Sequence, residues 1–147
     1  MLTIERSILI DRPLTQVWAF LTDLKNTPQW DVGVSETRVT SDGPPGLGTI
    51  FENVGMFLGR YSVREYKVTE YEPNRKVTVD MTTPPGFIRH GGVSYTFEPA
   101  GVGTRLTATG TVQLQGFFVL LQPILGQRAR RDVEGDLANL KRLLESQ

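Results

Sequence analysis

Three short stretches of the chain alternate strictly between apolar and polar side chains. A period of two is the spacing of a β-strand that has one buried face and one face in water. The stretches lie at 77–82, 93–98 and 106–112, and turn-forming residues separate them. Their apolar positions are predicted to form one continuous inner face: Val77, Val79, Met81, Val93, Tyr95, Phe97, Leu106, Ala108 and Val112.

The last part of the chain carries an apolar stripe that would cover this face. Val133, Leu137, Leu140 and Leu144 recur at the spacing of one side of an α-helix, and charged residues occupy the other sides. Upstream of the stripe, Pro123 is expected either to start the helix or to kink it. We therefore expect a sheet that is solvated on one face and covered by a C-terminal helix on the other.

The rest of the chain predicts further strands and two short helical segments. A helix is expected from Leu14 to Leu21, with Asp11 as its cap and Pro13 in its first turn, and one more helical turn around Trp30. The turns between neighbouring strands are short, which favours an antiparallel meander. The predicted strands span residues 3–10, 34–40, 49–54, 61–71, 76–81, 92–98 and 104–113.

Length and composition narrow the class of protein. The 147 residues, 16.4 kDa, are a usual size for one domain, so we treat 1–147 as a single unit. Lys and Arg equal Asp and Glu at 16 each, which argues against a nucleic-acid partner. There is no cysteine and one histidine, so no metal site or cofactor is expected. No stretch has the length of a membrane span, and we expect a cytoplasmic protein.

Several motifs along the whole chain match a known superfamily. They are turn, cap and packing residues, so they are specific for a fold and poor indicators of function. The motifs are Asp11-Arg12-Pro13-Leu14, Pro28-Gln29-Trp30-Asp31, Gly46-Leu47-Gly48-Thr49, Glu70-Tyr71-Glu72-Pro73, Tyr95-Thr96-Phe97-Glu98-Pro99, Gly103-Thr104-Arg105-Leu106 and Asp136-Leu137-Ala138-Asn139. In this order they resemble the START/Bet v1-like (SRPBCC) superfamily, and in particular its bacterial polyketide cyclase/dehydrase-like group.

The resemblance implies an α+β helix-grip fold. In that fold a seven-stranded antiparallel sheet wraps around a long C-terminal helix, with two short helices after the first strand. It also implies an internal cavity, because the superfamily includes lipid carriers, hormone binders, aromatase/cyclases and co-chaperone-like proteins. The fold alone cannot choose among these functions.

The resemblance places a ligand at the wide end of the sheet. In this chain that end is expected between the loop from Pro84 to Arg89 and the apolar segment from Phe117 to Leu125, which would form the mouth of a cavity of about 300–1,000 Å³. The predicted ligand-binding residues are Met81, Phe87, Arg89, Tyr95, Phe97, Phe117, Phe118, Leu121 and Leu125.

The ionisable residues give only a thin set of candidates for chemistry. Counting back from Phe97 turns Arg89 inward, where it could bind a carboxylate, and turns His90 outward, unless a bulge at Gly91 and Gly92 reverses the order. The alternative for Arg89 is a position at the rim, and no catalytic residue is assigned.

Two further strands contain acids and bases of uncertain direction. Arg64 and Glu65 lie on opposite faces of one strand, and the mixed pattern leaves open which of them faces inward. Glu52 shares the phase of two apolar neighbours, so it is either a buried acid or a surface residue.

We consider three functions from these observations. The first is binding of a small hydrophobic ligand, such as a lipid, an isoprenoid or an aromatic polyketide. The second is a polyketide aromatase/cyclase-type enzyme that would use Arg89, Tyr95 or His90 for proton transfer. The third is a protein-interaction domain with a filled interior and no ligand. Neither the ligand nor the oligomeric state follows from the sequence.

Overall fold

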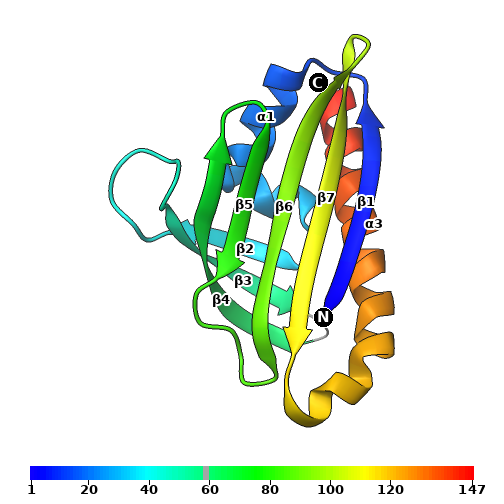
Figure 1. Ribbon diagram of the computed structural model, residues 1–147. Helices are drawn as coiled ribbons and strands as arrows, with labels where there is room; N and C mark the ends of the chain where they lie inside the picture. Colours follow the sequence, from blue (N-terminus) through cyan, green and yellow to red (C-terminus); the bar gives the residue numbers. More distant parts are fainter. Residues whose placement is uncertain (58–59) are drawn as a thin grey trace.

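A computed structural model describes residues 1–57 and 60–147. Seven antiparallel strands form one sheet in the order β1-β7-β6-β5-β4-β3-β2 (Figure 1). This is the predicted sheet of the helix-grip fold. The strands are β1 (Leu2–Ile10), β2 (Val34–Val39), β3 (Ile50–Phe57), β4 (Arg60–Glu72), β5 (Lys76–Met81), β6 (Ile88–Ala100) and β7 (Gly103–Leu114).

The helices lie at the start and at the end of the chain. The short helices α1 (Leu14–Thr22), η1 (Leu24–Asn26) and α2 (Thr27–Trp30) follow β1, as predicted. The last strand leads through η2 (Gly116–Leu121) into α3 (Gln122–Glu145). Figure 1 shows α3 running behind the sheet, alongside β1. Pro123 lies in the first turn of α3, so it starts this helix.

The C-terminal half of α3 closes the core as the apolar stripe predicts. Leu137, Leu140 and Leu144 are only 3%, 0% and 0% exposed. They belong to one buried cluster with Phe97 and Leu106 of the inner sheet face. The same cluster contains most of the inward positions predicted from the alternation.

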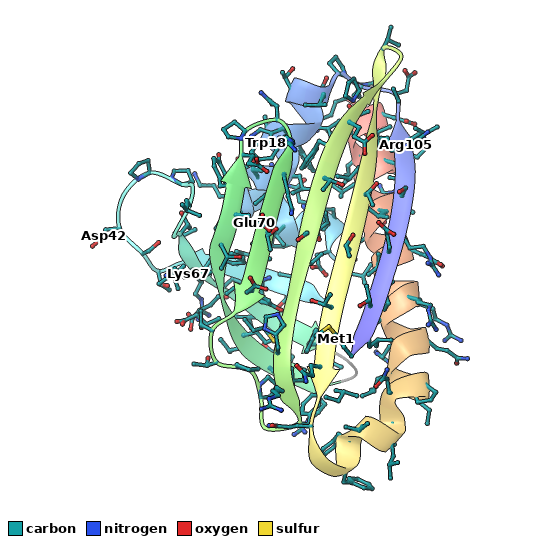
Figure 2. The ribbon with its side chains drawn as sticks, in the orientation of Figure 1. Met1, Trp18, Asp42, Lys67, Glu70 and Arg105 are labelled. Atoms are coloured by element: carbon teal, nitrogen blue, oxygen red, sulfur yellow. The ribbon has the colours of Figure 1, made fainter. Side chains whose placement is uncertain are left out.

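Polar residues occupy the opposite face of the sheet. Figure 2 shows Lys67, Glu70 and Arg105 among the side chains of this outer face. Hydroxyl groups link neighbouring strands there, for example Thr78 Oγ1 with Ser94 Oγ at 2.7 Å. The sheet is therefore wet on one side only.

Irregularities in two strands explain why part of the pattern could not be interpreted. The register of β4 against β5 shifts between Val68 and Glu70, so inward positions change from even to odd numbers along β4. As a result Arg64, Tyr66 and Tyr71 all line the same inner space. The register of β6 against β7 shifts between Ile88 and His90 in the same way.

The expected cap of the first helix is wrong. Pro13 takes the N-cap position of α1, and its carbonyl oxygen accepts hydrogen bonds from the backbone N–H groups of Gln16 and Val17 at 3.0 and 3.1 Å. Asp11 instead donates its backbone N–H to Glu145 Oε2 at 2.8 Å, which ties the end of β1 to the end of α3.

Candidate functional site

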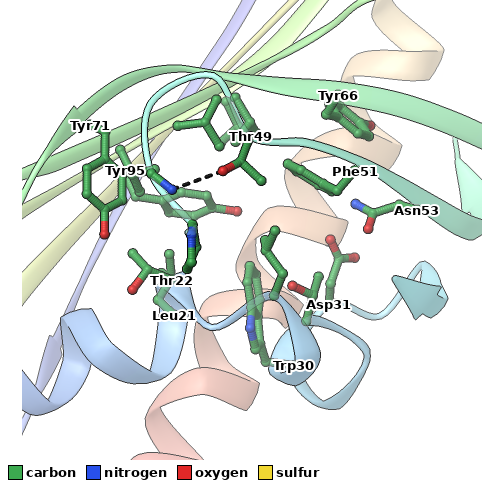
Figure 3. Close-up of a pocket in the computed structure, with 18 of the residues that line it drawn as sticks. Leu21, Thr22, Trp30, Asp31, Thr49, Phe51, Asn53, Tyr66, Tyr71 and Tyr95 are labelled. Atoms are coloured by element: carbon green, nitrogen blue, oxygen red, sulfur yellow. Dashed lines mark hydrogen bonds between the residues drawn. The ribbon is translucent and has the colours of Figure 1, made fainter. Parts of the chain in front are cut away.

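Two adjoining hollows lie beneath the centre of the sheet. The first, which we call the α2 lobe, has a volume of about 110 Å³ and lies between the α1–α2 region and the inner faces of β3 to β6. The second, the α3 lobe, has a volume of about 160 Å³ and lies between β6, β7 and α3. Figure 3 shows the α2 lobe, where the loop before β3 is fixed by the backbone N–H of Gly46 donating to Thr49 Oγ1 at 2.9 Å.

Glycines on neighbouring strands create the space of the α3 lobe. Gly91 of β6 and Gly110 of β7 both line it, and neither carries a side chain to fill it. A Cβ atom added at Gly110 would have no other atom within 4 Å, whereas one at Gly91 would lie 3.0 Å from Met81 Sδ. The lobe thus exists because glycines stand at these two inward positions, whereas most other inward positions of the sheet carry larger side chains.

Five residues line both lobes and lie where the two adjoin. Four of them are polar, and we call these four the polar belt; the fifth is Val93. The belt consists of Asp31, Arg64, Tyr66 and Tyr95. Since most of the remaining lining residues are apolar, the lobes form two apolar compartments on either side of a polar waist.

Arg64 is the most unusual member of the belt because it is a buried cation. It is 7% exposed, and its Nη1 donates to the hydroxyl of Tyr66 at 2.9 Å. Its guanidinium carbon also lies 4.6 Å from the ring centroid of Phe57, a cation–π contact. Its Nε and Nη2 have no hydrogen-bond partner in the described part of the chain. Buried donors without partners are rare because each costs about 1–3 kcal/mol, and more when charged.

Trp30 adds a further unpartnered donor on the wall of the α2 lobe. Its side chain is 4% exposed, and the indole Nε1 has no partner among the described residues. The ring packs edge-to-face on Tyr95, with the centroids 5.9 Å apart. Figure 3 shows Trp30 and Asp31 on the α2 side of the lobe, across from Phe51 and Tyr66.

Carboxyl groups from two elements gather on the helix side of the lobes. Asp136 of α3 accepts a hydrogen bond from the backbone N–H of Val32 at 2.8 Å. Burial raises the pKa of Asp136 to about 8, and the charges of Asp31 and Asp132 add to the rise. The protonated form of Asp136 is therefore present at neutral pH.

Asp31, which directly follows α2, is the second of these carboxyl groups and lines both lobes. Its carboxylate accepts a hydrogen bond from the backbone N–H of Gly33 at 3.0 Å. Burial raises the pKa of Asp31, while this hydrogen bond and the positive charge of Arg64 oppose the rise. Asp31 and Asp136 therefore titrate as an interacting pair, and the positive charge of Arg64 acts on Asp31.

The two tyrosines of the belt are neutral donors. Burial raises the pKa of the Tyr66 hydroxyl and raises the pKa of Tyr95 well above its usual value. A neutral hydroxyl both donates and accepts a hydrogen bond. The belt can therefore offer N–H and O–H donors together with one or more carboxylate acceptors.

The sequence-predicted ligand-binding residues divide into four groups, which lie in the two lobes, in the closed core, at a surface hollow and outside all of these. Tyr95 lines both lobes and Met81 lines the α3 lobe. Phe97 is 3% exposed in the closed core, where it packs edge-to-face on Trp18 at 5.0 Å. Leu125 is partly buried against that core.

The expected mouth forms a third hollow at the surface. Phe87 and Phe118 line it together with Phe57 and Arg60, and its volume is about 380 Å³. This volume falls in the predicted range, yet Tyr95 and Arg89 are not part of its wall. Phe117 is 68% exposed and turns away from all three hollows. Leu121 is half-buried and also lines none of them.

Of the two positions considered for Arg89, inward or at the rim, the structure shows one outside the lobes. Arg89 is the extra residue of the β6 bulge between Ile88 and His90, and it is exposed. His90 lies on the outer face, where its Nε2 is 3.5 Å from Asp80 Oδ1. Neither residue reaches the lobes, so the proton-transfer roles considered for them have no support from the geometry.

Sequence reasoning missed the acidic half of the site. The sequence presents Asp31 and Asp136 only as parts of family motifs, and Trp30 only as part of one such motif and as the centre of a helical turn. The one signal in the sequence that could have pointed to them is that these two aspartates stand in motifs made mainly of turn and packing residues. Glu52, considered as a buried acid, is half-buried and lines none of the lobes.

The described residues offer neither a membrane span nor a metal cluster. No helix in residues 1–57 and 60–147 is long and apolar enough to cross a membrane. No group of three or more histidine, cysteine or acidic side chains in the same ranges is placed to hold a metal ion.

Solved structures confirm the fold. A START superfamily protein from Mycobacterium smegmatis has a TM-score of 0.84 at 14% identity, with 99% of each chain covered. The Zhui aromatase/cyclase from Streptomyces sp. R1128 has a TM-score of 0.84 at 12% identity, covering 97% of this chain and 93% of that one. The protein TTHA0849 from Thermus thermophilus has a TM-score of 0.78 at 20% identity, covering 98% of this chain and 97% of that one.

Comparison at the level of sequence identifies the family. A search of curated proteins found no match. The family described as polyketide cyclase / dehydrase and lipid transport matches residues 1–145. That match spans nearly the whole chain and agrees with the helix-grip architecture. The chain therefore belongs to the polyketide cyclase/dehydrase and lipid transport family.

Proposed function

We propose that this protein binds a small, mainly apolar molecule in the α2 and α3 lobes. The observation that carries the proposal is the pair of buried donors without partners on Arg64, at the junction of two apolar hollows, together with the unpartnered indole N–H of Trp30 on the wall of the α2 lobe. A guest oxygen that accepted these hydrogen bonds would remove the cost of leaving them unmade. The family description and the START-like neighbours support the same interpretation.

The energetics favour a guest that fills more than one compartment. An aromatic ring buries about 150–250 Å², which corresponds to roughly 4–6 kcal/mol at about 25 cal/mol per Å². Association itself costs on the order of 4–15 kcal/mol. One ring alone would therefore bind weakly, and useful affinity needs apolar contact in both lobes.

The proposal is tested with an uncharged fluorescent probe, N-phenyl-1-naphthylamine. We expect its emission to rise and shift to the blue on addition of the wild-type protein. Gly110→Phe should abolish this response, because a side chain at Gly110 has open space and would fill the α3 lobe. Thr109→Phe is the matched control, since it adds the same ring one residue away on the outer face. A folded wild-type protein that binds no such probe would refute ligand binding and favour the interaction-domain alternative.

A second candidate function is proton transfer on a bound ketone. The specific observation is that Asp31, Asp136 and Arg64 all line the α3 lobe, where the charge of Arg64 acts on Asp31. A carboxylate of the pair would take a proton from the carbon next to the carbonyl, the C–H electron pair would form a carbon–carbon double bond, and the π electrons of the carbonyl would move onto its oxygen. Arg64 would stabilise the enolate oxygen so formed. Aromatase/cyclases among the structural neighbours are consistent with such chemistry.

Hydrogen exchange distinguishes catalysis from binding alone. Acetophenone in D₂O exchanges its methyl protons through the enolate, which proton NMR follows directly. An enzyme should accelerate this exchange, more strongly as the pH rises towards the pKa of Asp136, about 8, because the base must be deprotonated. Asp136→Asn should remove the acceleration, and the surface change Asp42→Asn should leave it intact. Saturable binding without accelerated exchange would leave binding as the function.

A further inference from the structure

We infer that the guest carries two apolar arms on either side of one neutral hydrogen-bond acceptor. This inference rests on the proposed function and specifies its ligand. Its basis is the order of compartments: an apolar lobe, the polar belt, and a second apolar lobe. A molecule with its polar group at one end would leave either a lobe empty or the belt donors unpaired.

The size of each lobe limits each arm. The α2 lobe holds about 110 Å³ and the α3 lobe about 160 Å³. An apolar cavity of about 150 Å³ in a protein binds benzene. The α3 lobe therefore accepts about one ring, the smaller α2 lobe accepts a short branched chain or a ring that reaches it only in part, and neither holds a fused polycyclic molecule or a long alkyl chain by itself.

The acceptor belongs in the middle because the donors are there. Arg64 lines both lobes, and its Nε and Nη2 are free of partners within the described residues. Trp30, whose Nε1 is also without a partner among the described residues, lines the α2 lobe and packs against Tyr95 of the belt. A carbonyl oxygen has two lone pairs and can take two of these N–H groups at once.

The charges around the belt favour a neutral acceptor over a carboxylate. The positive charge of Arg64 already interacts with Asp31. A guest carboxylate would have to share Arg64 with Asp31 and would also face Asp136 and Asp132 on the helix side. Like charges in a poorly solvated space repel strongly, so a ketone, ester or amide oxygen suits the belt better.

Three probes with two rings each test the position and charge of the acceptor. Chalcone has a ketone between its rings, 1,3-diphenylpropene has the same arms without oxygen, and biphenyl-4-carboxylate has its acceptor at one end with a charge. Displacement of N-phenyl-1-naphthylamine measures all three. We expect chalcone to bind at least about tenfold more tightly than either of the others, as a hydrogen bond to a charged donor allows.

Blocking one lobe at a time tests the two arms. Gly110→Phe fills the α3 lobe, and Val79→Phe fills the α2 lobe, the only one of the two lobes that Val79 lines. Isothermal titration calorimetry measures direct binding to these variants, because Gly110→Phe is expected to abolish the N-phenyl-1-naphthylamine signal. Either change should weaken chalcone about tenfold or more, whereas acetophenone, with one ring, should still bind each variant within about threefold of wild type. If only one of the two variants weakened chalcone, a single lobe would hold it and the two-armed guest would be refuted.

The outcomes separate this inference from the proposed function. A folded protein that binds neither N-phenyl-1-naphthylamine nor chalcone contradicts both. A protein that binds N-phenyl-1-naphthylamine, but binds chalcone no better than 1,3-diphenylpropene, keeps the proposed function and overturns the inference. Tighter binding of biphenyl-4-carboxylate than of chalcone would overturn it as well, in favour of a terminal anion.

Discussion

The two halves of α3 cover the same sheet in different ways. Towards the C-terminus, Leu140 and Leu144 are fully buried in one cluster with Phe97 and Leu106. Towards the N-terminus, α3 presents smaller and acidic residues to a stretch of the sheet that contains Gly110. The C-terminal half of α3 covers a close-packed core, and the N-terminal half covers the α3 lobe. The difference lies in side-chain size and polarity rather than in backbone topology.

The comparison shows how a single fold separates stability from function. Close-packed interiors lose stability with every atom removed, so the leucine half anchors the fold. The region around Gly91 and Gly110 is less closely packed, and this leaves space beside the polar belt for a guest. Three stability tests below break or sharpen this contrast, from the largest expected effect to the smallest.

Truncation of the leucine stripe should have the largest effect on stability. Leu140→Ala, or Leu137→Ala, removes side-chain atoms from a filled interior and should cost roughly 2–5 kcal/mol of unfolding free energy. Val133→Ala, in the half that lines the α3 lobe, should cost under about 1.5 kcal/mol. Chemical denaturation gives both values, and equal losses would mean that the two halves are packed alike.

The acid pair should make stability depend on pH. The folded pKa of Asp136 is about 8, above the unfolded value near 3.9, so the folded state binds the extra proton between these limits. Stability should therefore be greatest at the acid end of this window and fall as the pH rises, by up to about 1.4 kcal/mol per pH unit.

The matched variant for this pH dependence is Asp136→Asn. It keeps the shape of the side chain but cannot ionise, so it should flatten the decline between the unfolded and folded pKa values of Asp136. Denaturation curves at several pH values make the comparison. A wild-type stability that rose over this window would show that Asp136 is ionised throughout.

Changes at the two inner-face glycines should have the smallest effects. Gly110→Ala places a methyl group in open space and should raise stability by about 0.5–1 kcal/mol, the usual difference between the two residues inside regular structure. Gly91→Ala puts its methyl group 3.0 Å from Met81 Sδ, so it should gain less or lose. Thermal unfolding of the pair would decide, and an opposite order would place the free space at Gly91 instead.

Most of the fold could be predicted from the sequence because its signals are local and periodic. The alternation around Val79, Tyr95 and Leu106, together with the helical stripe of Leu137 and Leu140, defines both partners of the core. The prediction failed at Arg89, where a bulge breaks the count of two. It stayed open at Arg64, on the strand whose inward positions change parity at the β4 bulge.

The candidate site could be predicted only in small part. Its members come from the end of α2, the middle of β4, the middle of β6 and the middle of α3, and no spacing in the sequence connects them. Tyr95 was found because it continues an alternating run. Asp31, Asp136 and Arg64 meet only through tertiary packing, and glycine positions such as Gly110 give no positive signal of a cavity.

The most direct test of the account uses the two tryptophans of the chain as reporters, one in each region. Trp30 lines the α2 lobe, packs against Tyr95 of the belt and has an indole N–H without a partner among the described residues, whereas Trp18 lies in the closed core against Phe97. Proton–nitrogen NMR spectra of the indole groups would be recorded during a titration with chalcone. We predict a downfield shift of the Trp30 N–H resonance, as it gains an acceptor, and little change at Trp18. Saturable binding that left Trp30 unmoved, or that moved Trp18 as much, would contradict a guest held at the polar belt.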